Sequence, residues 1–308
     1  MIRLWRAAAL AALGGLVNAS PAAVDERYDY CVYQPPAPAQ TYGFAHCASK
    51  QFGVKSIPMI FVVPDAHARA VVGSNGFTED TMQKARDGDG PSSYLMGRLY
   101  AQAQDQEAAL FWYHRGADAG DAQSMTTLGQ YAQGAHKPGE ADKWFRAAAD
   151  KSNTLAMIQL GLMYGRGEYG ATKDPEEAVR WYKRGAALGN IPCIRELANA
   201  YAKGEGVERN AAEALRLYLI AASKGDPLAE FALANLYETG DGITKNEAEA
   251  ARWYRTVATD WTWKPAMIKL SAMYHDGRGV PKDEQQAEYW RAKSQEEPVF
   301  VIQTAPPK

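Results

Sequence analysis

The sequence predicts an all-α solenoid of about six helix-turn-helix repeats, preceded by a small irregular segment with some β structure. A tyrosine recurs at spacings of 31 to 37 residues, and an aromatic pair follows it in most units. Glycines lie between these two landmarks, where a tight turn would join two helices. The tyrosines are Tyr100, Tyr131, Tyr164, Tyr201, Tyr237 and Tyr274, and the pairs are Trp112-Tyr113, Trp144-Phe145, Trp181-Tyr182, Trp253-Tyr254 and Tyr289-Trp290. Such a period is typical of stacked two-helix units.

The composition describes an ordered and nearly neutral protein. The chain has 308 residues, of which 46% are apolar, so it can bury a sizeable core. Its 34 Lys and Arg residues nearly balance 36 Asp and Glu residues. This balance gives no general attraction to nucleic acid or to an anionic membrane. The three cysteines are too few for a disulfide-dense scaffold or a four-thiolate zinc site.

Residues 1–19 have the features of a secretory signal peptide. Arg3 and Arg6 precede an uncharged run from Ala7 to Val17, and small residues follow up to Ala19. This run is too short to cross a bilayer, which needs about 20 apolar residues. We therefore expect an exported protein without a membrane span, located in the periplasm.

Residues 20–77 do not repeat, and we expect them to form a separate N-terminal segment. Cys31 and Cys47 flank a proline-rich stretch in the least regular part of the chain. In an exported protein these two cysteines are expected to form a disulfide. Residues 59–63 and 68–72 are predicted to be two short strands of a hairpin around Pro64-Asp65.

The repeats are expected to occupy residues 78–294. Residues 78–90 form a capping half-repeat whose helix runs from Thr78 to Asp87, because the terminal units of a solenoid must cover its open face. After Glu297, Pro298 cannot continue the last helix, so residues 295–308 are predicted to form an extended tail.

Helix caps mark the ends of the expected helices. Asp174 precedes Pro175, which suits the first position of a helix. The equivalent caps of later units are Asn210, Asn246 and Asp283, and glycines that suit left-handed helix stops are Gly120, Gly189 and Gly225. Small residues that allow close helix packing share one register, as in Ala156 and Ala229. Cys193 lies in that register, so we interpret it as a free buried thiol rather than a catalytic one.

Two units carry the pattern most clearly: Ala156-Leu160-Gly161-Tyr164 with Ala178-Trp181-Tyr182-Ala186-Gly189, and Ala266-Leu270-Tyr274-Gly277-Gly279-Val280 with Ala287-Tyr289-Trp290. This pattern resembles the Sel1-like repeats, which are related to tetratricopeptide repeats. The resemblance implies a right-handed superhelical α-solenoid that covers most of the chain. Unit two departs from it, because residues 135–139 replace the Gly-x-Gly turn, and unit one lacks the turn glycines.

No pattern of catalytic or metal-binding residues stands out. The residue types of 165–170 match the dinucleotide-binding sequence motif G-x-G-x-x-G. That motif requires a strand before its helix, whereas here it joins two helices. The five histidines are scattered, and the chain has no G-x-S-x-G motif. We therefore expect no enzymatic activity, no cofactor and no metal site.

Helix geometry predicts which side chains line a concave groove. At about 100° per residue, Phe231, Asn235 and Glu238 point away from the face that carries Ala229 and Leu233. The equivalent and adjacent positions give the predicted groove: Tyr94, Arg98, Gln102, Ile158, Leu162, Arg166, Arg195, Asn199, Lys203, Phe231, Asn235, Glu238, Ile268 and His275. Its apolar members are covered either by a partner or by the neighbouring repeat. Trp261 and Trp263 replace the expected small-residue end of unit five, and they form either a second anchor or a plug against unit six.

These observations predict a non-enzymatic protein-binding scaffold. Its partner would be a polypeptide, either a toxin or effector enzyme or a periplasmic sensor domain. The resemblance implies, most concretely, an immunity protein that neutralises a periplasm-acting toxin such as a type VI phospholipase effector. Two alternatives stay open: a regulatory, secretion or exopolysaccharide adaptor subunit, and a hydrolase acting on the cell wall or on β-lactams.

Overall fold

The computed structural model describes residues 30–34, 42–49, 54–62, 79–102 and 105–296. The chain forms two compact units, residues 1–112 and 113–308. The described residues contain three strands and thirteen α-helices. None of these helices is long and apolar enough to cross a membrane. The predicted signal peptide, residues 297–308 of the predicted tail, and residues 63 and 68–72 of the predicted hairpin lie outside the described residues. Gln295, the first residue of the predicted tail, instead belongs to the last helix, α15 (Glu284–Gln295).

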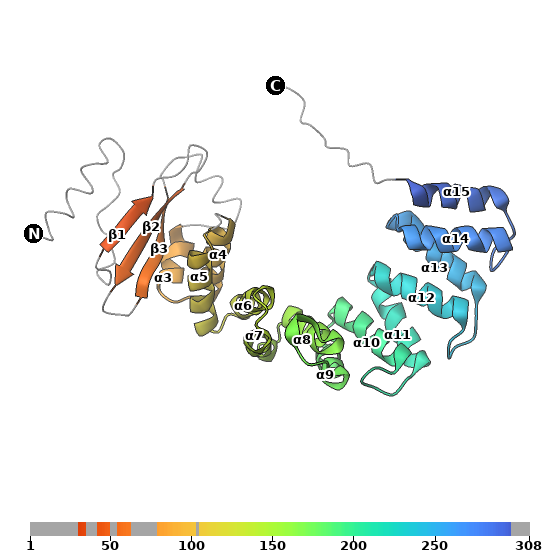
Figure 1. Ribbon diagram of the computed structural model, residues 1–308, viewed down its shortest axis with the longest axis horizontal. Coiled ribbons are helices and arrows are strands. Elements are labelled where there is room, and N and C mark those ends of the chain that lie inside the picture. The colour runs from red at the N-terminus through yellow and green to blue at the C-terminus, as the bar shows by residue number, and fades with distance from the viewer. Residues whose placement is uncertain (1–29, 35–41, 50–53, 63–78, 103–104, 297–308) are drawn as a thin grey trace, which may run out of the picture. The chain divides into compact units, whose positions relative to one another are not determined.

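The first unit contains a three-stranded antiparallel sheet (Figure 1). Its strands are β1 (Tyr30–Gln34), β2 (Tyr42–Ser49) and β3 (Val54–Val62), and β2 lies in the middle. Residues 59–62 of the predicted hairpin belong to β3. The sequence predicted some β structure in this segment but did not locate β1 and β2, which pair so that Cys31 is opposite Cys47. Aromatic and β-branched residues such as Tyr30, Val32 and Tyr33 favour strands despite the nearby prolines.

Three helices follow the sheet: α3 (Glu79–Arg86), α4 (Gly90–Gln102) and α5 (Gln106–Asp118). Helix α3 corresponds to the predicted capping helix and packs against α4. Asp89 caps α4, since its carboxylate accepts a hydrogen bond from the backbone N–H of Ser92 at 2.8 Å.

The second unit is a stack of two-helix repeats. The first helices of these repeats are α6 (Ala122–Gly134), α8 (Thr154–Arg166), α10 (Ile191–Lys203), α12 (Pro227–Thr239) and α14 (Lys264–Asp276). The second helices are α7 (Pro138–Asp150), α9 (Pro175–Ala187), α11 (Ala211–Ser223), α13 (Glu247–Asp260) and α15 (Glu284–Gln295). A short 3-10 turn, η2 (Glu168–Gly170), follows α8. From α6 to α15 each helix packs against its neighbours in the chain, and α8 also contacts α6 and α10. The repeats of this unit follow an arc (Figure 1), which confirms the predicted solenoid.

The predicted caps are confirmed. Asp174 accepts a hydrogen bond from the backbone N–H of Glu177 at 2.9 Å, and Asn210, Asn246 and Asp283 make the equivalent bonds. The predicted stops Gly120, Gly189 and Gly225 have φ angles of 87°, 78° and 75°. These bonds and angles follow from the local sequence alone, which is why they could be predicted.

The second glycine of the Gly-x-Gly turn sets the stacking of neighbouring repeats. A Cβ atom on Gly206 would lie 2.0 Å from the carbonyl oxygen of Pro175, at the start of α9 in the preceding repeat. Any larger residue would push the two repeats apart. The turn therefore serves the contact between repeats as well as the reversal of the chain.

The core lies between the two helices of each repeat. Leu160, Leu233 and Leu270 are fully buried, and Cys193 is a fully buried free thiol, as predicted. Trp290 occupies the register of Trp253, three residues after the buried alanine that the second helices share. Arg291 therefore stands where the other repeats have Phe145, Tyr182, Tyr218 and Tyr254. The predicted aromatic pair Tyr289-Trp290 is thus shifted by one residue.

Candidate functional site

The apolar groove residues of α8 are covered by the next repeat. Ile158 is buried in one cluster with Ile194 and Leu197 of α10, and Leu162 packs against the same cluster. Their coverage corresponds to the second of the two alternatives drawn from the sequence, packing between repeats. These side chains therefore stabilise the stack rather than contact solvent.

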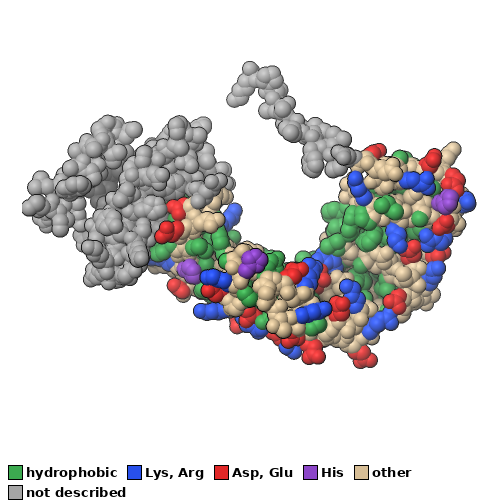
Figure 2. Space-filling model, viewed as in Figure 1, with side chains coloured by type: hydrophobic (Ala, Val, Ile, Leu, Met, Phe, Trp, Pro, Cys, Tyr) green, Lys and Arg blue, Asp and Glu red, His purple; other side chains and the backbone are tan. Residues whose placement is uncertain are grey.

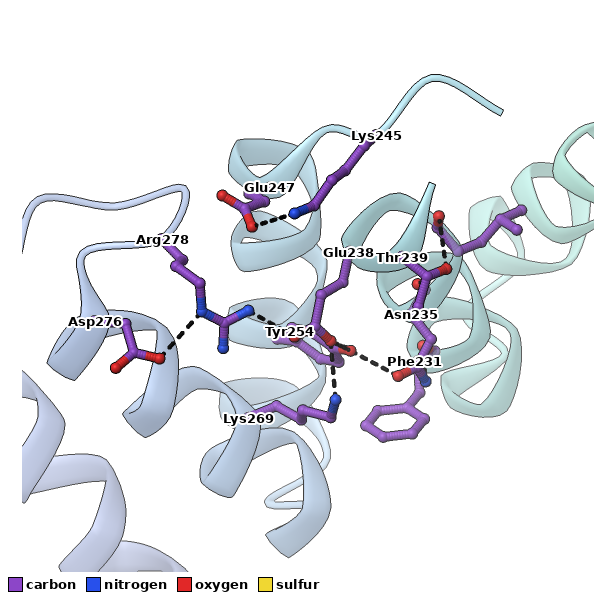
Figure 3. Close-up of polar contacts among 11 residues, drawn as sticks. Phe231, Asn235, Glu238, Thr239, Lys245, Glu247, Tyr254, Lys269, Asp276 and Arg278 are labelled. Atoms are coloured by element: carbon purple, nitrogen blue, oxygen red, sulfur yellow. Dashed lines mark hydrogen bonds and ion pairs between the residues drawn. The ribbon is translucent and has the colours of Figure 1, made fainter. Parts of the chain in front are cut away.

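Glu238 is the centre of a polar network that joins two repeats (Figure 3). Its carboxylate accepts hydrogen bonds from Lys269 at 2.9 Å and from Arg278 at 3.0 Å, and the hydroxyl of Tyr254 lies 2.7 Å away. The side chain is only 11% exposed. Burial acts to raise the pKa of Glu238, but the bonds from Tyr254, Lys269 and Arg278 outweigh it and hold the pKa below its usual value. Glu238 therefore remains charged within the stack.

Three other polar groove residues of α10 and α12 also bond within the stack. Arg195 donates to Asp226, the N-cap of α12, at 2.7 Å and to Glu196 at 3.0 Å. Asn199 accepts from the hydroxyl of Tyr218 at 2.6 Å. Asn235 accepts from the hydroxyl of Tyr254 at 2.7 Å. Except for the bond to Glu196, these contacts join different helices, so the periodicity of a single helix could not predict them.

Six residues of the predicted groove are exposed: Arg98, Gln102, Arg166, Lys203, Ile268 and His275. Arg98 and Gln102 lie on α4 of the first unit, with the half-buried Tyr94 on the same helix. Arg166 forms an ion pair with Glu168 at 3.4 Å, and His275 lies 2.9 Å from Glu284. In the second unit the exposed apolar member is Ile268, with 58% of its surface accessible.

Ile268 and His275 line a shallow hollow of about 260 Å³ between α14 and α15. The other lining residues are Ser271, Ala272, Asp276, Arg291 and Ser294. The hollow opens where Arg291 replaces the aromatic residue of the other second helices. Its size suits a side chain of a partner better than a whole small-molecule ligand.

Trp261 and Trp263 have different roles. The ring of Trp263 is half-buried and lies 4.9 Å from the ring of Phe231, so it fills the space between repeats. Trp261 is 48% exposed at the end of α13. Figure 2 shows hydrophobic side chains gathered on the inner side of the arc towards its C-terminal end. The large apolar side chains exposed on α12 to α14 and the turn before α14 are Leu228, Trp261 and Ile268.

Glu230 is absent from the predicted groove, yet it is the buried acid next to this apolar surface. It lies one position after the buried small residue of α12. The same position in the other first helices of the second unit is apolar: Met125, Met157, Ile194 and Met267. Comparing the repeats position by position would have found this exception from the sequence.

Catalytic chemistry has little support in the described part of the chain. Burial raises the pKa of Cys193 to about 12, with the charge of Glu196 adding to that rise, so its thiol stays protonated. Among the described residues no three His, Cys, Asp or Glu side chains are grouped as metal ligands would be. What this surface offers is exposed apolar and charged groups for recognition.

The Sel1 repeat model matches residues 89–121, 154–190, 191–226, 227–258 and 264–293, which together make up more than half of the chain. The chain belongs to the Sel1 repeat family. Residues 122–153 are outside these matches, but α6 and α7 form a Sel1-like helix pair there. The missing Gly-x-Gly turn explains why this repeat departs from the family pattern.

Two solved Sel1 repeat structures have the same fold. A protective antigen of uropathogenic Escherichia coli strains is 29% identical over 70% of this chain, with a TM-score of 0.65. The match covers 48% of that protein, so this chain spans about half its length. A Sel1 repeat protein from Oxalobacter formigenes is 27% identical over 75% of this chain and 91% of its own, with a TM-score of 0.60. An immunity protein from Pseudomonas aeruginosa is 18% identical over 60% of this chain and 72% of its own, with a TM-score of 0.39, too distant to relate its role to this Sel1 repeat protein.

Proposed function

We propose that this Sel1 repeat protein acts in the periplasm as a non-enzymatic inhibitor, binding a toxin such as a phospholipase effector of a type VI secretion system. The observation that carries the binding role is the set of large apolar side chains exposed on α12, α14 and the turn between α13 and α14. Leu228, Trp261 and Ile268 are each at least 45% exposed. Exposed tryptophan and aliphatic side chains of this kind are typical anchors of protein interfaces.

The periplasmic site of action rests on the sequence. Arg3 and Arg6 followed by a short apolar run describe a secretory signal peptide. An inhibitor in the periplasm must bind its toxin tightly without a reaction of its own. A stack of repeats suits this task, because it offers an extended surface rather than a closed catalytic pocket.

The test is inhibition of a periplasm-acting lipase encoded beside this chain. Protein comprising residues 20–308 should abolish the lipase activity at a near-stoichiometric ratio. The double substitution W261A/I268A should weaken inhibition at least tenfold, because it removes two of the three exposed anchors. L188A is the matched control, since Leu188 is 52% exposed at the position of α9 that corresponds to Trp261. Lipase activity that is unchanged under saturating protein would overturn the inhibitor role.

A further inference from the structure

The turn between α13 and α14 differs in two respects from most other turns between repeats. Its left-handed residue is Thr262, with φ of 49°, and its N-cap is Trp263, which makes no side-chain cap hydrogen bond. The equivalent left-handed residues are Gly88, Gly120, Ser152, Gly189 and Gly225, and the caps are Asp89, Asp121, Asn153, Asn190 and Asp226. A β-branched residue in the left-handed region and an uncapped helix both lower stability. Such local costs gather at functional sites.

A third exception lies beside this turn. Glu230 is 5% exposed, whereas Met125, Met157, Ile194 and Met267 occupy its position in the other first helices of the unit. Its Oε2 atom is buried and has no hydrogen-bond partner among the described residues. A buried carboxylate oxygen without a partner is costly, so it needs an explanation.

The side chains that act on the pKa of Glu230 are acidic or aromatic. Burial raises the pKa of its carboxyl, the indole N–H of Trp261 opposes this rise, and the charges of Asp260 and Asp226 add to it. Asp226 is paired with Arg195 at 2.7 Å. In the described part of the chain, neither Glu230 nor Asp260 has an ion pair with a Lys or Arg side chain. Two carboxylates without a basic partner thus lie next to an exposed tryptophan.

We propose that Glu230, Asp260 and Trp261 form a binding site for an arginine side chain of the protein partner. A planar guanidinium can stack on the indole of Trp261 and donate hydrogen bonds to carboxylate oxygens at the same time. Because Glu230 Oε2 is buried, the guanidinium would reach it only where the indole of Trp261 shifts to admit it, and it would then supply the missing hydrogen-bond partner. The apolar stem of the arginine would lie along the surface that Trp263 and Phe231 fill.

The three exceptions follow from this site. The turn carries two tryptophans: the ring of Trp261 is exposed, and the ring of Trp263 packs against Phe231. Glu230 must be acidic at a position where the stack prefers a methionine. This inference rests on the proposed protein-binding function and names the chemistry that the partner must present.

The experiment uses two peptides that differ at one residue, acetyl-Leu-Arg-Leu-amide and acetyl-Leu-Gln-Leu-amide. Protein comprising residues 20–308 is labelled with ¹⁵N, and the indole N–H signal of Trp261 is assigned with W261F. The arginine peptide should shift this signal saturably, with an affinity at least five times that of the glutamine peptide. Equal affinities, or no saturable shift with the arginine peptide, would overturn the proposal.

The variant E230M places the residue of the other repeats at this position, so it is expected to fold. It should lose the preference for arginine, whereas the exposed control L188A should keep it. A preference retained in E230M would contradict the site. The lipase assay separates the two proposals. Inhibition without a preference for the arginine peptide would contradict only the arginine site. A preference for the arginine peptide without inhibition would contradict only the toxin as the partner.

Discussion

Glu238 occupies a groove position by helix geometry but serves the contact between two repeats. Of its neighbours, Lys269 and Arg278 come from the following repeat, and Tyr254 comes from α13, the partner helix in the same repeat (Figure 3). Ile158 shows the same outcome for an apolar residue, since α10 covers it. The exposed recognition surface of the second unit is therefore narrower than the helix register alone predicts.

The charge of Glu238 should contribute to stability in a pH-dependent way. Its pKa is lowered in the folded protein from an ordinary value of 4.5. A lowered pKa stabilises the fold above the pKa of the unfolded state, and this contribution is lost as the pH falls through the folded-state pKa. We expect E238Q to lower the free energy of unfolding by about 1–2 kcal/mol at pH 7, a modest value because Lys269 and Arg278 are partly exposed.

Urea denaturation at several pH values checks this prediction. The difference between wild type and E238Q should shrink as the pH falls below about 4.5. E205Q is the control, because Glu205 is exposed, and it should leave the unfolding curve unchanged. A difference that stays constant from pH 7 to pH 3 would show that the charge of Glu238 does not contribute.

At the scale of elements, the repeats provide internal comparisons for one another. Five of the first-helix N-termini have an Asp or Asn cap, and α14 has Trp263 instead. The arginine site proposed above depends on this exception. The turn before α14 is therefore locally less stable than the other turns, and it carries the exposed Trp261.

Replacing Thr262 with glycine should recover part of this stability. Glycine adopts φ of 49° without strain, so T262G should raise the free energy of unfolding by about 1 kcal/mol. S152G, at the equivalent position with φ of 63°, should act in the same direction. A248G, on the exposed face of α13, should instead lose up to about 1 kcal/mol. Urea midpoints measure all three, and a destabilised T262G protein would refute strain at this turn.

At the scale of the whole molecule, the compartment of the protein decides the state of its cysteines. Cys31 and Cys47 are opposite each other in the pairing of β1 with β2. Directly opposite residues of an antiparallel pair are close enough for a disulfide after small adjustments. Cys193 is free and buried in the second unit. We propose that export leads to a Cys31–Cys47 disulfide, which would stabilise by about 3 kcal/mol.

Thiol counting tests this proposal. Denatured, unreduced protein isolated from the periplasm should show one free thiol per chain, from Cys193, and reduction should raise the count to three. The variant C193A should show none before reduction. Three free thiols in the periplasmic protein would contradict both the disulfide and the oxidising compartment.

The sequence by itself determined the repeat, its family and most of its turns. Caps such as Asp174, stops such as Gly189 and the small-residue register of Cys193 depend on neighbours within one or two helical turns, which a sequence pattern records. Even the exceptions at Glu230 and Thr262 can be read by aligning the repeats. The strands around the cysteines were missed, because strand pairing joins residues that no local pattern connects.

Only the tertiary structure decided which outward-facing residues remain accessible. Arg195, Asn235 and Glu238 are drawn into bonds with the next repeat or with their partner helix, whereas Ile268 and Trp261 stay exposed. The reason is that helix periodicity fixes the direction of a side chain relative to its own helix. Coverage depends on what the neighbouring repeat places there, and on the closeness that glycines such as Gly206 permit.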